Sequence, residues 1–134
     1  MLAPNLLLLA WPPRGPHPRP RVPWPFAWLE RAGQALCLVV PAITAVGTPR
    51  VPWLLPALAA LGAYYALWGR YFGRGRSWAS LYAPLWVIPV PMAVFPVMCF
   101  LAAAVALQNW WMAAAAVVLA CGHIPVSLLS RGPS

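Results

Sequence analysis

Four long apolar runs, separated by short polar or proline-containing stretches, dominate the chain. They cover about residues 26–46, 51–68, 81–107 and 110–129. A helix needs roughly 20 predominantly apolar residues to cross the hydrocarbon core of a bilayer. The pattern therefore predicts an all-α integral membrane protein, a bundle of four transmembrane helices within residues 26–130.

The third run is interrupted by proline. Pro84, Pro89, Pro91 and Pro96 all fall within it. A proline inside a helix removes a backbone hydrogen bond and clashes with the preceding turn. We predict an irregular or interfacial segment first, then helix from about Pro91 to Leu107, so that the third span is bent by proline.

The two ends of the chain differ from the apolar runs. Residues 1–25 hold eight of the 18 prolines, alternating with arginines. Because proline fixes φ and lacks an N–H, we predict an extended or disordered tail over residues 1–25. This segment is either a flexible cytoplasmic tail or sequence upstream of the true start codon. Residues 131–134 are predicted to form a short polar tail.

Charge strengthens the membrane prediction. Residues are 63% hydrophobic and only 7% charged, with nine arginines, no lysine and the single acid Glu30. A soluble domain is about one quarter charged, so a soluble fold is excluded. With both termini in the cytoplasm, the outer loops carry only Arg50. The cytoplasmic parts then carry Arg14, Arg19, Arg21, Arg31, Arg70, Arg74, Arg76 and Arg131.

This asymmetry follows the rule that basic residues stay on the cytoplasmic side. We therefore expect a cell (plasma) membrane protein that crosses several times, with both termini cytoplasmic. The lysine-free, alanine- and arginine-rich composition is typical of a GC-rich coding sequence, and we expect a bacterial membrane. Arginines between apolar runs meet anionic lipid, so we expect the bilayer as a partner and no nucleic acid.

Residues 69–76 are predicted to be a polar, turn-forming loop, since they hold three glycines and three arginines. Arg70, Arg74 and Arg76 either fix the topology or form a contact for lipid phosphate or a partner protein, because arginine binds phosphate with two hydrogen bonds.

His123 lies inside the fourth apolar run, where an ionisable side chain is costly and marks a candidate functional site. Helical spacing places it on one face with Ala116, Ala120, Ser127 and Ser130. The most polar face of the first span has the same spacing: Glu30, Gln34, Cys37, Pro41 and Thr44. By depth, His123 is expected level with Gln34 and Cys37. If the two spans touch, a pocket open to the cytosol would be lined by Glu30, Gln34, Cys37, His123 and Ser127.

Several interpretations of these groups stay open. His123 could join two helices by a hydrogen bond to a carbonyl or to Gln34, handle a ligand or proton, or bind a metal or haem. A second haem ligand would have to be His17 or come from a partner chain. Glu30 is either a solvated acid at the helix start beside Arg31 or a coupling carboxylate.

The expected function follows from the catalytic motifs that the sequence lacks and from these polar side chains. One acid cannot supply two-carboxylate catalysis, and no phosphate-loop or zinc-binding motif occurs. Cys37, Cys99 and Cys121 are expected as free thiols. We expect no enzyme and no cofactor, but an accessory or self-assembling subunit, in a homo-oligomer or a larger complex. The alternative is a carrier for a small amphipathic or lipid-like solute. The third hypothesis is a membrane enzyme using His123 with Cys37 or Cys121.

Overall fold

The computed structural model describes residues 2–16 and 20–131, with side chains from residue 6 onwards. His17, Arg19 and residues 132–134 of the tail predicted at 131–134 lie outside the described residues. The elements are α1 (Leu2–Ala10), α2 (Trp24–Ile43), the 3-10 turn η1 (Val51–Trp53), α3 (Leu54–Gly73), α4 (Trp78–Leu81), α5 (Pro91–Ala106) and α6 (Trp110–Ser130). The described part of the chain is thus all-helical, as predicted, with no strand beyond isolated bridges.

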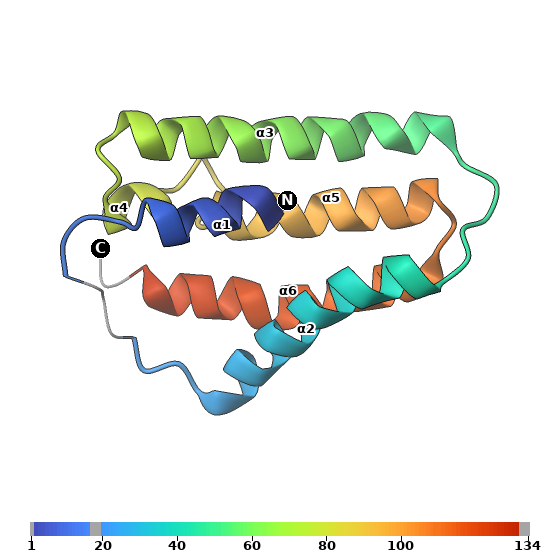
Figure 1. The fold of residues 1–134 in the computed structure, drawn as a ribbon, viewed down its shortest axis with the longest axis horizontal. Coiled ribbons are helices and arrows are strands. Elements are labelled where there is room, and N and C mark those ends of the chain that lie inside the picture. Colours follow the sequence, from blue (N-terminus) through green and yellow to red (C-terminus); the bar gives the residue numbers. More distant parts are fainter. Residues whose placement is uncertain (1, 17–19, 132–134) are drawn as a thin grey trace.

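The four long helices lie side by side in the order α3, α5, α6, α2 (Figure 1). Packing is extensive between α2 and α6, between α6 and α5, and between α5 and α3. The α2 helix has no comparable contact with α3. The arrangement is therefore an open row whose first apolar helix pairs with the last one in the sequence.

Three of the helical segments are long and apolar enough to cross a membrane: Trp24–Ile43, Val51–Gly73 and Trp110–Ser130. The apolar helix Pro91–Ala106 is shorter. These lengths are consistent with the predicted membrane protein, because each long segment reaches the roughly 20 residues that a span requires.

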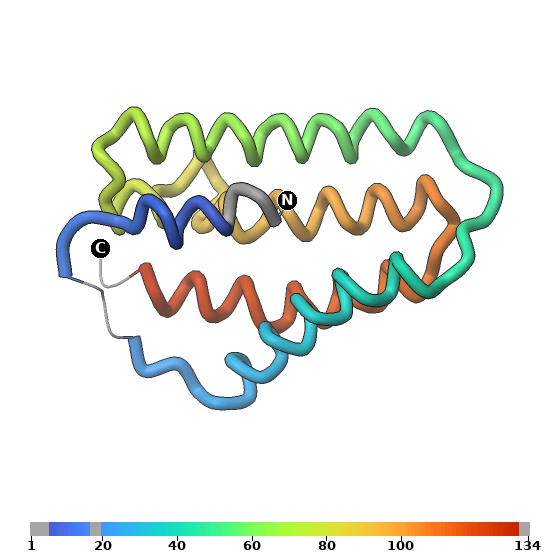
Figure 2. The backbone as a smooth tube through the Cα atoms, in the orientation of Figure 1, coloured from blue at the N-terminus to red at the C-terminus, as the bar shows by residue number. Residues whose placement is uncertain are grey.

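The proline-rich part of the third run is irregular, as its sequence predicts. Helix α5 begins at Pro91, where the missing N–H has no helical partner to lose. Between α4 and α5 the backbone forms a tight turn, with hydrogen bonds in both directions between Leu85 and Ile88. The tube in Figure 2 shows this segment folded back beside the end of α3.

The predicted loop at residues 69–76 is mostly helical, which corrects the sequence-based boundary. Helix α3 continues to Gly73, five residues past the predicted end of the span. Tyr71 is fully buried against Tyr64 and Trp68, so the aromatic side chains that continue the helical spacing hold this last turn in place. The turn itself is confined to the next residues, where Gly75 and Arg76 have positive φ.

The extended or disordered tail predicted for residues 1–25 is wrong for its first part, because Leu2–Ala10 forms α1. Only one proline falls in that stretch, in the first turn, where a helix tolerates it. Leu7 and Leu8 pack against the cluster around Tyr64 and Tyr71. The Tyr71 hydroxyl also donates a hydrogen bond of 3.2 Å to the carbonyl of Trp11. Tertiary packing therefore stabilises a helix that is too short to persist alone.

Asn109 joins the ends of α2 and α6 at the far end of the row. Its side-chain oxygen accepts from the Met112 N–H at 3.0 Å, which caps α6, and its amide donates to the Thr44 hydroxyl at 2.7 Å. We expect Asn109→Ala to lower the free energy of unfolding by about 1–2 kcal/mol, because a buried cap and an interhelical bond are lost together. Thermal unfolding in detergent measures this. Gln108→Ala, which removes an exposed hydrogen bond to the Thr48 carbonyl, is the control and should change stability less.

Candidate functional site

Two glycines bring α2 and α6 into close contact and so position the site. A Cβ added at Gly33 would overlap the backbone of Leu119, and one added at Gly122 would overlap the backbone of Glu30. Small residues let helix backbones approach closely where lipid supplies no hydrophobic drive. The contact between the first and fourth apolar runs, assumed in the sequence-based pocket, is therefore present.

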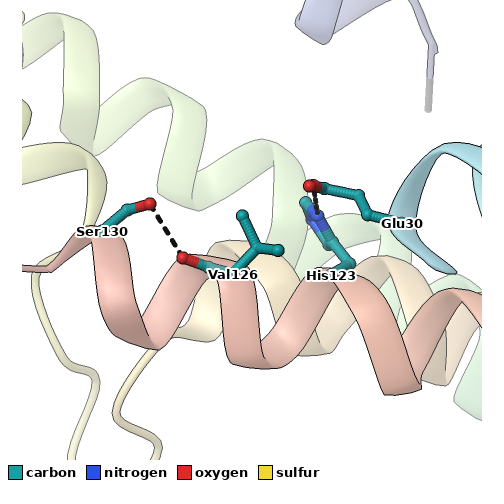
Figure 3. Close-up of polar contacts among 4 residues, drawn as sticks. All are labelled: Glu30, His123, Val126 and Ser130. Atoms are coloured by element: carbon teal, nitrogen blue, oxygen red, sulfur yellow. Dashed lines mark hydrogen bonds and ion pairs between the residues drawn. The ribbon is translucent and has the colours of Figure 1, made fainter. Parts of the chain in front are cut away.

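This close approach sets Glu30 directly beside His123 (Figure 3). The distance between Glu30 Oε1 and His123 Nδ1 is 2.6 Å, which suits a charge-assisted hydrogen bond donated by the ring nitrogen to the carboxylate. The side chains are only 26% exposed for His123 and 20% exposed for Glu30. Each ionisable group therefore offsets much of the cost of burying the other.

A cavity of about 150 Å³ adjoins this pair. Its polar wall includes Glu30, His123 and Ser127, three of the five residues predicted to line a pocket. The full lining comprises Leu8, Glu30, Tyr64, Trp68, Leu81, Tyr82, Val90, Met92, Ala93, His123, Val126 and Ser127. The cavity is thus shared by α2, α6, α3 and α5, while α1 contributes Leu8 and α4 contributes Leu81.

The other two predicted lining residues do not reach this cavity. Cys37 is buried in an apolar cluster with Val97, Ala115 and Leu119, and Gln34 is exposed. The face of α2 that packs against the protein carries Glu30, Gly33 and Cys37, because Gly33 contacts α6 directly. His123 accordingly lies opposite Glu30, not level with Gln34 and Cys37 as the depth estimate predicted.

The α6 face predicted from helical spacing does point into the protein. Ala116, Ser127 and Ser130 are buried, while Ala120 and His123 are half-buried. The Ser130 hydroxyl donates to the carbonyl of Val126 at 2.8 Å, as Figure 3 shows. This bond leaves Ser127 as the hydroxyl of this face that lines the cavity.

The aromatic wall of the site was not predicted from the sequence. Trp68 and Tyr82 line the cavity, together with Tyr64. Helical spacing of Tyr64, Trp68 and Tyr71 on α3 is the signal that could have revealed one inward aromatic face.

The three arginines predicted to contact lipid phosphate or a partner are not equivalent. The Arg70 guanidinium donates to the carbonyls of Ala83 at 2.8 Å and Pro84 at 3.4 Å. These bonds satisfy backbone oxygens of the irregular segment before α5. Arg74 is exposed, and Arg76 is half-buried, with its carbonyl accepting the Arg14 N–H at 2.6 Å. Arg74 is therefore the guanidinium of this group most open to an outside partner.

Metal ligands do not cluster in the described part of the chain. No group of three or more His, Cys, Asp or Glu side chains gathers there in a way that could hold a metal ion. Cys37, Cys99 and Cys121 are free thiols and range from buried to exposed. Comparison of the chain with protein-family models, curated proteins and solved structures finds no match.

Proposed function

We propose that this protein crosses the cell membrane four times and acts as a non-catalytic subunit that assembles with copies of itself or with a larger membrane complex. Helix α5 makes the remaining crossing together with the irregular segment before it. The end of α3, which carries Arg70, and the end of α6, which precedes Arg131, lie at one end of the row with the start of α2 (Figure 1). That end is proposed to face the cytoplasm, along with both termini.

The observation that supports assembly is the position of α2 at the edge of an open row. Only 11% of the apolar 18-residue segment of α2 is buried inside the protein, against 28% for the corresponding segments of α3 and α6. Its exposed apolar residues include Leu36, Leu38, Val39 and Ile43, and α6 is the long helix that packs most extensively against it. A helix with a partner on one side can accept a second helix on the other, from a copy or a partner subunit.

Oxidative cross-linking tests this proposal. In a protein with Cys99 and Cys121 replaced by alanine, we expect Val39→Cys on α2 to give a disulfide-linked dimer in native membranes. The matched control is Leu58→Cys, at a similarly exposed position on α3 (62% exposed, against 51% for Val39). Purification in mild detergent with mass spectrometry identifies any other subunit. A lone monomer, with no cross-link at Val39→Cys, would contradict assembly.

A second candidate function, a carrier for a small solute, is favoured by one specific observation. The Glu30–His123 pair lies on a cavity between the helices, where polar side chains and aromatic rings converge. Binding cavities of proteins combine mostly apolar walls with a few placed polar groups in this way. Loss of transport by vesicles containing Glu30→Gln, with the protein intact, is the result expected of a carrier.

A further inference from the structure

We propose that the cavity beside Glu30 binds a small organic cation, an ammonium group on an apolar body about the size of a benzene ring, with the Glu30 carboxylate as counter-ion. This inference goes beyond the subunit role, and it names the ligand class for the carrier candidate. Four features of the cavity support it: its charge, its walls, its volume and the free oxygen of its carboxylate.

The charge lining the cavity is opposite to the charge of the protein. The chain has a net charge of +8 and a single acidic residue, Glu30, which is part of the lining. None of the described arginines lines the cavity, so His123 is the one basic side chain there. A phosphate or carboxylate ligand would meet Glu30 without a guanidinium to bind it. A cation would gain the carboxylate without a fixed positive charge to repel it.

The walls suit a cation with an apolar body. Tyr64 and Trp68 of α3 face the cavity with Tyr82, and the Tyr64 and Trp68 rings meet edge to face at 6.4 Å between centroids. Aromatic faces carry partial negative charge and attract ammonium groups. Leu81, Val90 and Met92 supply apolar contact for the rest of a ligand.

The volume and the carboxylate geometry set the size and binding mode. A cavity of about 150 Å³ is large enough for a benzene molecule. Glu30 Oε1 accepts from His123 Nδ1, and Oε2 has no partner among the described residues. Because an ionised carboxylate has about four acceptor positions, Glu30 can accept from an ammonium while it stays bonded to His123. The Ser127 hydroxyl offers a further acceptor on the same wall.

Three probes test the proposal on the full-length protein in detergent, each a benzene ring with a small polar group: benzylammonium, benzyl alcohol and benzoate. We expect benzylammonium to bind saturably in calorimetry and to raise the melting temperature. Benzyl alcohol should bind at least tenfold more weakly, and benzoate should not bind. Equal binding of benzyl alcohol and benzylammonium, or a preference for benzoate, would overturn a cation site.

Two variants assign the effect to the carboxylate. Glu30→Gln keeps the shape and should weaken benzylammonium binding at least tenfold while leaving benzyl alcohol binding unchanged. The control is Gln34→Ala on the same helix, whose side chain is exposed and does not line the cavity, and it should bind benzylammonium as tightly as the wild type. An equal loss in Glu30→Gln and Gln34→Ala would contradict the proposal. If Glu30→Gln fails to fold, the three probes on the wild type still decide. The cross-linking of α2 is measured separately, so failure of assembly and failure of cation binding are distinguishable.

Discussion

Gly122→Leu is expected to prevent stable packing of α2 on α6, with a loss of about 3 kcal/mol or more in the free energy of unfolding. A Cβ at Gly122 would overlap the backbone atoms of Leu29 and Glu30, which cannot rotate away as a side chain can. Overpacking of a tight contact usually costs about 1–3 kcal/mol, and a whole leucine against backbone lies at or above that range. Thermal unfolding in detergent and the yield of monodisperse protein measure the effect.

The chain offers a matched control on α3. Gly62 and Gly69 are also helical glycines, and an added Cβ at either meets no atom within 4 Å. We expect Gly62→Leu to be close to neutral, since the added side chain starts into open space and leucine favours helix over glycine. A Gly122→Leu protein as stable as the wild type would show that α2 and α6 do not meet at these glycines.

Replacing His123 alone is expected to cost more than replacing His123 and Glu30 together. In His123→Leu the carboxylate, only 20% exposed, loses its hydrogen-bond partner. We expect a loss of about 2–3 kcal/mol, because removing one member of a largely buried pair leaves the other unpaired. The double variant His123→Leu with Glu30→Met should return to within about 1 kcal/mol of the wild type.

A double-mutant cycle of unfolding free energies measures this coupling. The control pair is Arg31→Met with His123→Leu, because Arg31 adjoins Glu30 in sequence but is exposed. Its effects should add without coupling. Additive losses for the Glu30 and His123 changes would mean that their contact contributes nothing to the folded state.

The long helices could be predicted from sequence, because the length of each apolar run reports directly on helix length. The contact of α2 with α6 was only assumed from their matching polar faces, and the packing of the two helices shows it. The identity of the His123 partner could not be predicted. Depth along the helices placed His123 level with Gln34 and Cys37. The contact at Gly33 and Gly122 instead shifts the register of the two helices and pairs His123 with Glu30. Gln34 was placed in the pocket because it shares a helical stripe with Glu30, yet glycine occupies the contact and leaves Gln34 exposed.

Two further differences arise from tertiary packing, which a local pattern does not contain. Residues 1–25 were treated as one proline-rich segment, although only one of their eight prolines, Pro4, lies in α1. Glycine and arginine at 69–76 predicted a turn, but burial of Tyr71 against α1 and α3 extends the helix to Gly73. In both places aromatic packing overrides the local preference of the backbone.

The pairing of Glu30 with His123 also has a consequence for the order of events during synthesis. The two residues are 93 positions apart in the chain. At a synthesis rate of about 5–20 residues per second, the carboxylate of the first span waits roughly 5–20 s before its partner is made. In the proposed membrane topology, α2 is in the bilayer without α6 throughout that interval. The newly made first span would then depend on the insertion machinery or on the water at the membrane surface to solvate Glu30 until the last helix arrives.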